Sequence, residues 1–225
     1  MNRQLLEHYV KLTAFLGQVL GPDYEVALHD LTDKSQSLIA IANSHISGRQ
    51  VGAPLTNMAL KMLMDREYEQ ADYRLNYRGE TEDGRTLRSS TLFIKHGGRI
   101  VGMLCINFDH SKYLSISESI LQLCHPNAFV ETNFQLDEAR ITHRAPDDEG
   151  AERIQASLDA LAEDAVAKAL AEAQGQPLAV HDRLALVRRL EADGIFLVKG
   201  AVGRVAGLIG VSQATLYRDL KVVRR

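Results

Sequence analysis

The sequence predicts an α+β protein in which a five-stranded antiparallel sheet is followed by an all-α tail. Three observations lead to this prediction. Apolar residues recur with helical spacing before residue 20, in short strand-like runs between residues 24 and 109, and with helical spacing again after residue 151. Glycine-containing turns separate the later strand candidates. Basic residues outnumber acidic ones only in the tail. We therefore expect a sheet domain joined to a small basic helical domain.

Composition excludes several classes of protein. A chain of 225 residues with 45% hydrophobic and 24% charged residues is typical of a globular protein. Its apolar run at residues 100–108 is far shorter than the ~20 residues of a transmembrane helix. Glu7 and Lys11 interrupt the region where a signal peptide needs an apolar core. Two cysteines, Cys105 and Cys124, form neither a disulfide framework nor a four-cysteine zinc site. We expect a cytoplasmic protein.

The first elements are predicted from changes in apolar spacing. Residues 4–20 have the pattern of an amphipathic helix that ends at Gly21-Pro22. Two short apolar runs, 24–31 and 37–43, are separated by the turn-forming sequence TDKSQ and are predicted to pair as strands. After a stretch rich in glycine and proline, residues 55–63 carry one apolar helical face.

Three further strands complete the predicted sheet, at residues 73–78, 86–95 and 99–109. The turns between them contain Gly84 and Gly97-Gly98, because glycine accepts the positive φ that tight hairpin loops require. Two strands, a helical crossover and a three-stranded meander describe a PAS-like sensory fold, which we place at residues 1–140.

The segment after the sheet is predicted to connect two domains. Helical turns are expected near 116–123 and 128–136, and residues 145–150 form an acidic, turn-rich linker. An alanine-rich helix is expected over 151–173, within a connecting segment at 141–177. Its apolar stripe fits either a homodimer contact or packing against the protein's own body, and it consists of Ile154, Leu158, Leu161, Ala165, Ala169 and Ala173.

The tail, residues 178–225, has the features of a helix-turn-helix. Residues 181–225 contain nine Lys or Arg and four acidic residues, a net charge of +5, whereas the remainder carries 17 basic and 25 acidic residues. A helix at 178–190 precedes a motif in which Ala206 is the small residue where two helices cross and Gly210 makes the turn. Ser212 is placed to cap the second helix. Five apolar residues are expected to face inward: Val205, Ile209, Val211, Leu216 and Leu220.

The outward face of the second helix suits the major groove of DNA. Gln213, Tyr217 and Lys221 recur every four residues, and glutamine can pair with adenine as arginine can with guanine. The DNA-binding residues predicted are Ser212, Gln213, Ala214, Thr215, Tyr217, Arg218, Lys221 and Arg224. An ordinary helical hairpin is the alternative. Asp219 would repel phosphates, so we expect it to pair with Arg204 or Arg218 or to face solvent.

Long ordered matches give the chain a family resemblance. The segments GPDYEVALHDL, IANSHISGRQVGAPLT and NYRGETEDGRTLRSSTLFIKHGGRIVGMLCINFD, and in the tail LEADGIFLVKGAVGRVAGLIGVSQATLYRDL, resemble the YheO-like PAS-domain transcriptional regulators, the family of the D-arginine utilisation repressor. The resemblance implies a sensory domain joined to a helix-turn-helix that represses or tunes genes of small-molecule, often amino-acid, metabolism. At Asp219 the family more often has an aromatic or apolar residue.

A polar cluster near residue 45 is the candidate effector site. In a PAS-like fold the end of the second strand borders the ligand cavity, where Arg49 can grip a carboxylate and Asn43 can orient it. The alternative is structural, with Asn43 capping the turn. The predicted ligand-binding residues are Asn43, His45, Arg49, Tyr77, Ser90 and Asn107. The scattered histidines predict no metal site and no cofactor, although one axial histidine would suffice for a haem.

These observations predict a DNA-binding regulator rather than an enzyme. The partners expected are a double-stranded DNA operator, a small-molecule effector, for which an amino acid is the candidate class, and a second copy of the chain, since a dimer reads two half-sites ~34 Å apart. The alternatives are a small-molecule enzyme that uses the α+β cavity, for which the sequence offers no nucleophile elbow or phosphate loop, and a protein-interaction module.

Overall fold

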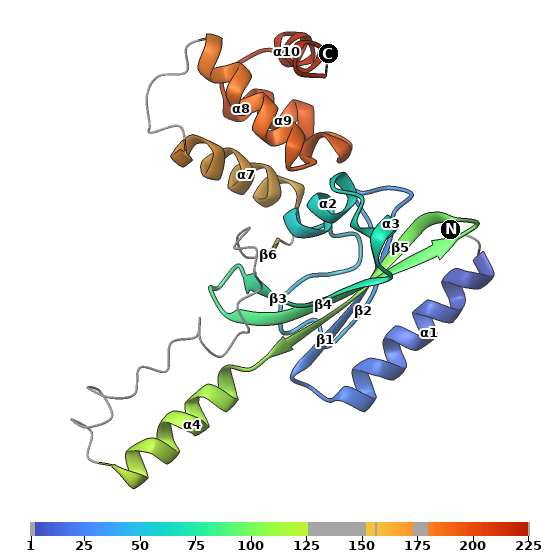
Figure 1. Ribbon diagram of the computed structural model, residues 1–225, viewed down its shortest axis with the longest axis vertical. Helices are drawn as coiled ribbons and strands as arrows, with labels where there is room; N and C mark the ends of the chain where they lie inside the picture. The colour runs from blue at the N-terminus through green and yellow to red at the C-terminus, as the bar shows by residue number, and fades with distance from the viewer. Residues whose placement is uncertain (1–2, 126–151, 156, 173–179, 225) are drawn as a thin grey trace.

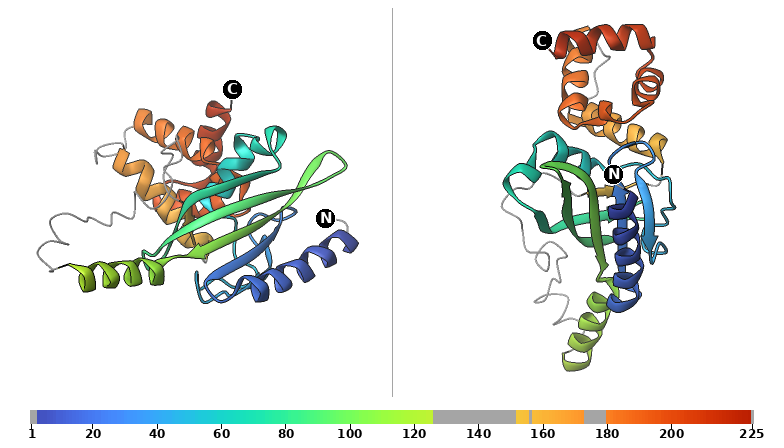
Figure 2. Two further views of the ribbon diagram at one scale, coloured as in Figure 1. Left: turned by 60° about the horizontal axis from the view of Figure 1, so that its bottom comes forward. Right: turned by 90° about the vertical axis from the view of Figure 1, so that its right-hand side faces the viewer.

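The computed structural model describes residues 3–125, 152–155, 157–172 and 180–224. A twisted sheet has the long helix α1 (Arg3–Leu20) along one face, and α2 (Asn57–Met64) and the short α3 (Glu67–Gln70) on the other (Figures 1 and 2). The C-terminal helices stack beyond α2, at the end of the molecule opposite α4 (Ser111–Cys124) (Figure 1). The predicted turns at residues 128–136 and the linker at 145–150 lie outside the described residues.

The sheet has the strand order β2-β1-β5-β4-β3-β6. The first five strands are antiparallel, as predicted, and they are β1 (Tyr24–Asp30), β2 (Leu38–Ala42), β3 (Tyr73–Thr81), β4 (Thr86–His96) and β5 (Arg99–Asp109). The hairpin glycines adopt the positive φ that the turns require, 82° at Gly84 and 57° at Gly97. The order is that of a PAS-like sheet.

A sixth strand corrects the prediction for residues 151–173. Glu152–Ile154 form β6, which pairs in parallel with β3, and the helix α7 begins only at Leu158. The sheet is therefore mixed. Three residues are too few for alternation to distinguish a strand from the start of an alanine-rich helix, so pairing with a distant strand decides the conformation.

The two faces of the sheet have different characters. On the α1 side, Val26, Leu28 and Leu104 pack with apolar residues of the helix. On the α2 side, alternate strand positions carry polar groups such as Glu25, His29 and Ser89 among apolar ones, and all three are buried. The sheet therefore has one apolar face and one buried face with mixed chemistry.

The C-terminal helices form a compact unit made of α7 (Leu158–Glu172), α8 (Val180–Ala192), the 3₁₀ turn η1 (Ile195–Leu197), α9 (Ala201–Leu208) and α10 (Gln213–Val223). Leu161, Ala165 and Ala169 of α7 are buried in the cluster that includes α8 and α9. The apolar stripe thus packs against the protein's own body, and the homodimer alternative for this stripe is wrong. Ile154 is buried in β6 instead, and Ala173 lies outside the described residues.

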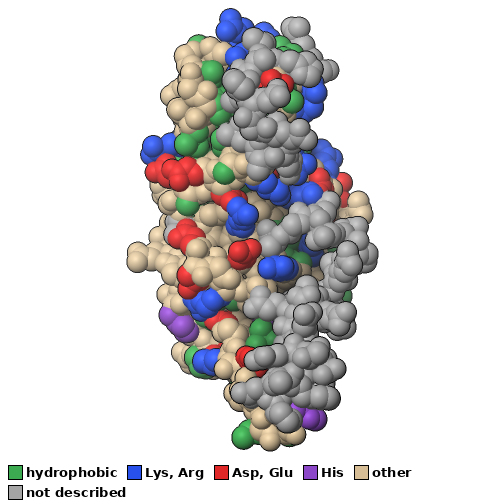
Figure 3. Space-filling model, turned by 90° about the vertical axis from the view of Figure 1, so that its left-hand side faces the viewer, with side chains coloured by type: hydrophobic (Ala, Val, Ile, Leu, Met, Phe, Trp, Pro, Cys, Tyr) green, Lys and Arg blue, Asp and Glu red, His purple; other side chains and the backbone are tan. Residues whose placement is uncertain are grey.

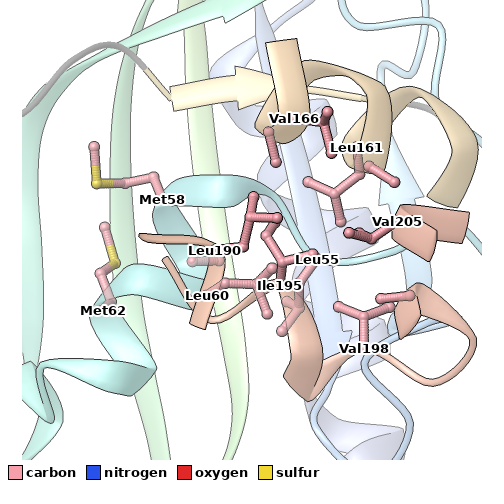
Figure 4. Close-up of a cluster of buried hydrophobic side chains, with 14 of the residues drawn as sticks. Leu55, Met58, Leu60, Met62, Leu161, Val166, Leu190, Ile195, Val198 and Val205 are labelled. Carbon is pink, nitrogen blue, oxygen red and sulfur yellow. The ribbon is translucent and has the colours of Figure 1, made fainter. Parts of the chain in front are cut away.

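One apolar cluster joins the sheet domain to the C-terminal helices. Leu55, just before α2, and Leu60, in α2, pack with residues of the C-terminal helices. These residues are Leu190, Ile195 and Val205 (Figure 4). Met58 and Met62 also project from α2, and all these side chains are buried. A displacement of α2 would therefore also displace the C-terminal helices that pack against it.

Gly194 provides a test of this junction. Its φ is 76°, and a Cβ there would lie 2.9 Å from Met64 Cγ and 3.2 Å from the Leu60 carbonyl oxygen. We expect Gly194→Ala to lower the free energy of unfolding by roughly 2 kcal/mol, from left-handed strain and overpacking together. Urea unfolding followed by circular dichroism measures this. Gly207→Ala is the matched control, because a Cβ there meets nothing within 4 Å. Equal stability of the two variants would contradict the close approach.

Candidate nucleic-acid interface and buried polar cluster

Helices α9 and α10 form the predicted helix-turn-helix. Gly210 makes the turn with a φ of 70°, and the Val211 amide donates to the Ala206 carbonyl at 2.9 Å. Ser212 caps α10, since its hydroxyl accepts from the Thr215 amide at 3.1 Å. Ala206 is 1% exposed where the helices approach. The small residue, the turn glycine and the cap are confirmed.

The inner side of α10 is apolar and the outer side is polar. Leu216 and Leu220 are buried together with Val205, while Ile209 and Val211 are partly buried. On the other side, Tyr217 is 59% exposed. The remaining predicted DNA-binding residues are also exposed except Thr215, which is partly buried; the exposed ones are Ser212, Gln213, Ala214, Arg218, Lys221 and Arg224. Lys and Arg side chains lie at this end of the molecule (Figure 3).

Asp219 has a partner that the sequence did not indicate. Its carboxylate is buried and accepts from Arg183 of α8, with Nε 2.6 Å from Oδ2 and Nη2 3.4 Å from Oδ1. The predicted pairing with Arg204 or Arg218, or exposure to solvent, is wrong. Asp219 faces α8 because it lies next to Leu220 on the inner side of α10. It therefore fixes the helix in place and is removed from the surface that would meet phosphates.

Arg224 and Arg204 are also held by carboxylates. Arg224 donates to both oxygens of Glu191 on α8, at 2.8 and 3.0 Å, although it remains about half exposed. Arg204 pairs with Asp159 of α7 at 2.6 Å. Within the described part of the chain, Arg218 and Lys221 form no ion pair, whereas Arg224 would have to leave Glu191 to reach a phosphate.

A second site lies inside the sheet domain, on the face that α2 covers. Arg49 is 1% exposed and donates to Glu25 Oε1 at 2.8 Å, while Ser47 donates to Glu25 Oε2. The Asn107 amide also donates to Glu25 Oε1, at 2.9 Å. Arginine and carboxylate thus form a buried, hydrogen-bonded pair, an arrangement in which each charge depends on the other.

Further polar residues of this interior connect the strands to β6 and α2. Thr56 donates to Glu152 Oε1 at 2.6 Å and caps α2 by accepting from the Ala59 amide at 3.2 Å. The Tyr77 hydroxyl lies 2.7 Å from Thr91 Oγ1, which lies 3.2 Å from Cys105 Sγ. All of these residues are buried. We call the set Glu25, Ser47, Arg49, Thr56, Tyr77, Ser89, Thr91, Asn107 and Glu152 the interior polar cluster.

The structure brings together half of the predicted ligand-binding residues. Arg49, Tyr77 and Asn107 belong to the interior polar cluster. The others do not: the Asn43 amide donates to three backbone carbonyls, those of Gly17, Gly21 and Tyr24, and His45 is exposed. Asn43 thus has the structural role given as its alternative.

Ser90 lies on the opposite face from the cluster. Its neighbours Ser89 and Thr91 point to the interior, and its register partner Ile106 packs near α1. At β4 the prediction of Ser90 is therefore wrong by one position, because successive side chains of a strand point to opposite faces. Glu25 and Ser89 could have been found by counting alternate positions along their strands. Glu152 gives no such signal, because the alanine-rich spacing of residues 151–173 predicts a helix there.

Burial alters the pKa of several groups in this interior. Desolvation, with a smaller effect of Arg49, lowers the pKa of His29 to about 3, so the imidazole is neutral and shares a hydrogen bond with Ser37. Burial raises the pKa of Cys105 to about 12. Burial also raises the pKa of Glu152, although Thr56, Arg49 and the nearby hydroxyls of Ser89 and Tyr77 act in the opposite direction.

The neutral His29 predicts acid sensitivity. Below pH 6.5, the ordinary pKa of histidine, His29 binds a proton in the unfolded chain but not in the folded chain. The free energy of unfolding therefore decreases as the pH is lowered from about 6.5 to about 3. We expect a loss of roughly 3 kcal/mol by about pH 4.5, partly offset because Glu152 is protonated more readily when folded. Urea unfolding above pH 6.5 and at pH 4.5 should show a smaller loss of stability for His29→Gln than for wild type or for the exposed His96→Gln. Equal losses in all three proteins would refute the assignment.

The described residues also bear on metal binding and membrane insertion. Among those residues, no three His, Cys, Asp or Glu side chains are grouped to hold a metal ion. No helix in the same ranges is both long and apolar enough to cross a bilayer. Cys105 is a buried core residue, as expected, and Cys124 is exposed.

Comparison with known proteins agrees with this architecture. A family model described as the YheO-like PAS domain matches residues 1–125, and one described as an HTH domain matches residues 161–221. The chain is 26% identical over 216 residues to the uncharacterized protein YheO of Escherichia coli strain K12, covering 95% of this chain and 82% of that protein. It is 28% identical over 226 residues to the transcriptional regulator DauR of Pseudomonas aeruginosa, covering 97% and 94%. The YheO-like PAS model spans the sheet domain, and the chain therefore belongs to the YheO-like PAS family, with an HTH domain at its C-terminal end.

Proposed function

We propose that the protein is a sequence-specific DNA-binding transcriptional regulator, acting as a repressor, whose PAS-like domain senses a small metabolite. The observation that carries the proposal is the exposed polar face of α10. Gln213, Tyr217 and Lys221 lie on it, while the apolar side and Asp219 face the protein. A helix with this division fits the major groove, where side chains read base edges and cations meet phosphates.

The sensory role is supported by the interior polar cluster. A PAS-like sheet domain that needed only stability would fill this face with apolar side chains, yet it buries an arginine, two carboxylates and several hydroxyls. Such a polar interior is costly unless it is hydrogen-bonded, and it is suited to recognising a polar ligand. We propose Arg49, Tyr77 and Asn107 as effector-site residues, with residues 1–140 as the sensory domain and 178–225 as the DNA-binding domain.

A homodimer in the cytoplasm follows from the same proposal. One helix-turn-helix covers only one half-site, and known readers of this kind pair two helices about one turn of DNA apart, roughly 34 Å. No catalytic role is proposed. The similarity to a protein named transcriptional regulator supports regulation rather than chemistry.

Selection from a library of random DNA duplexes tests the proposal. The purified full chain is expected to enrich one sequence that contains two related half-sites with centres roughly 34 Å apart. Sedimentation of the complex should give two chains per duplex. Recovery of duplexes without any common sequence would refute sequence-specific binding, and one chain per enriched duplex would refute the dimer.

A further inference from the structure

Three buried polar atoms of the interior polar cluster form no hydrogen bond within the described part of the chain. They are Ser89 Oγ, Asn107 Oδ1 and Glu152 Oε2. The three residues are at most 2% exposed. Leaving such atoms unpaired is unfavourable, so each unpaired buried group in a native protein calls for a partner. The shared feature of the three is their position on one face of the sheet.

Two of the three atoms, Ser89 Oγ and Glu152 Oε2, lie beside Gly79, and Asn107 is the strand neighbour of Ser89. Ser89 of β4 is the register partner of Asn107 on β5, and Gly79 of β3 is the register partner of Leu87, two residues before Ser89. A Cβ at residue 79 would lie 2.5 Å from Ser89 Oγ and 3.7 Å from Glu152 Oε2. The Asn107 amide nitrogen is already bound to Glu25, so its oxygen is the end that is free to accept. A side chain at residue 79 would therefore collide with Ser89 Oγ and approach Glu152 Oε2.

The chemistry of the three atoms selects a donor. An amide oxygen and a carboxylate oxygen only accept hydrogen bonds, and a serine hydroxyl can accept. The buried charges point the same way, because the interior contains two carboxylates, Glu25 and Glu152, and one guanidinium, Arg49. His29 is neutral there. A ligand with one positive charge and several N–H groups would satisfy both the acceptors and the charge.

A ligand carboxylate has no comparable partner. The guanidinium that we expected to grip one, that of Arg49, is held by Glu25 and Ser47. An incoming carboxylate would have to displace Glu25, which would then be buried without its charge partner. The interior therefore favours the cationic end of a metabolite over its anionic end.

A cavity beside β6 is also mainly acidic, although none of the three atoms lines it. A space of about 440 Å³ lies beside β6, between the end of β3 and α7. Its lining includes Glu80, Glu82, Glu163 and Asp164, with Arg153 as the one basic residue lining it. Carboxylates gathered in a concave surface attract cations and raise their local concentration.

We propose that Ser89, Asn107 and Glu152 bind the ammonium group of the effector, which is therefore a primary amine or an amino acid recognised through its amino group. The inference rests on the proposed sensory function and specifies its ligand. Binding also has a route to the DNA-binding helices. Glu152 belongs to β6, which leads into α7, and its other oxygen is bound by Thr56, the cap of α2.

The contacts of α2 complete this route. Asn57 accepts from the Arg153 amide at 2.8 Å, which ties β6 to the first turn of α2. Leu60 on the same helix packs in the cluster with Leu190 and Ile195 (Figure 4). An ammonium group at Glu152 therefore acts on the two elements that hold the C-terminal unit. By linkage, an effector that changes DNA affinity must bind with a different affinity when DNA is present.

Matched sets of three compounds test the inference with the full chain. For each common amino acid, the decarboxylated amine and the deaminated acid are also used, for example valine, isobutylamine and isovalerate. Thermal shift followed by calorimetry is expected to show at least one set in which the amino acid and the amine bind and the acid does not. Binding of the acid but not the amine would overturn the inference, as would a lack of binding in every set.

Variants locate the site. Glu152→Gln should lower the affinity for the compound that binds by about tenfold or more, because the substitution removes the charge that faces the ammonium group. Glu118→Gln, at an exposed position of α4 outside the cavity, is the matched control and should leave affinity unchanged. Gly79→Ala should block binding, and circular dichroism shows whether it folds; Asn107→Ala provides a second variant if it does not. An unchanged affinity of Glu152→Gln would refute the site.

The same preparations are assayed for retention on duplex DNA. Intact DNA binding together with no response to any amine refutes this inference and leaves the regulator proposal standing. If the wild-type protein is not retained on duplex DNA, the regulator proposal is refuted, whether or not amines bind.

Discussion

Arg183→Ala is expected to lower the free energy of unfolding by about 3 kcal/mol, the largest stability effect predicted for the C-terminal unit. Its partner Asp219 has 8% of its side chain exposed, so removal of the guanidinium would leave a carboxylate largely buried without a charge partner. The Arg183 side chain is itself 17% exposed, which places the loss at the lower end for buried ion pairs. Urea unfolding at neutral pH and moderate salt measures the change.

A matched arginine and a double variant separate the causes. Arg204→Ala breaks a pair with Asp159 in which both side chains are more than half exposed, so its cost should stay below about 1 kcal/mol. Arg183→Met combined with Asp219→Leu should recover most of the stability, since an apolar pair can replace a buried ionic one. If Arg183→Ala and Arg204→Ala cost the same, the buried role of Asp219 is wrong.

The second large effect concerns DNA recognition. Gln213→Ala should change which bases are preferred at one position of the selected duplex, with a loss of about 1–3 kcal/mol of discrimination there. Lys221→Ala should instead weaken binding to every duplex by a similar factor, because a phosphate contact carries no sequence information. The two residues differ in effect because of their positions on the helix. Gln213 is the first residue of α10, whereas Lys221 lies two turns further along. Competition between single-base variants of the duplex measures both effects.

Lys199→Ala serves as the control for the charge change. This lysine is exposed but precedes α9, away from the outward face of α10. It should leave both preference and affinity nearly unchanged. Equal loss of affinity on every duplex for Gln213→Ala and Lys221→Ala would contradict the separation of base contacts from phosphate contacts.

The fold was predictable wherever local chemistry determines it. Apolar spacing identified α1, the five antiparallel strands and the inward residues of α10, and the glycines at 84, 97 and 210 marked turns that need positive φ. Ser212 identified a helix start, because a hydroxyl there accepts from Thr215. These features depend on neighbours within a few residues.

The remaining features depend on residues that are far apart in the chain. Asp219 pairs with Arg183, 36 positions away, and Glu152 reaches Thr56, 96 positions away. β6 forms because β3 offers a free edge, not because ERI has strong strand character. Of the candidate effector site, the sequence indicated Arg49, Tyr77 and Asn107, but the carboxylates that surround them became visible only when the strands were paired.

The central claim is that the outward face of α10 binds duplex DNA, and the salt dependence of binding tests it most directly. The logarithm of the wild-type association constant should fall linearly with the logarithm of salt concentration. For Arg218→Ala combined with Lys221→Ala, the slope should be shallower by about two phosphate contacts, and affinity should fall at low salt. An unchanged slope and affinity in the double variant would show that DNA binds elsewhere or not at all.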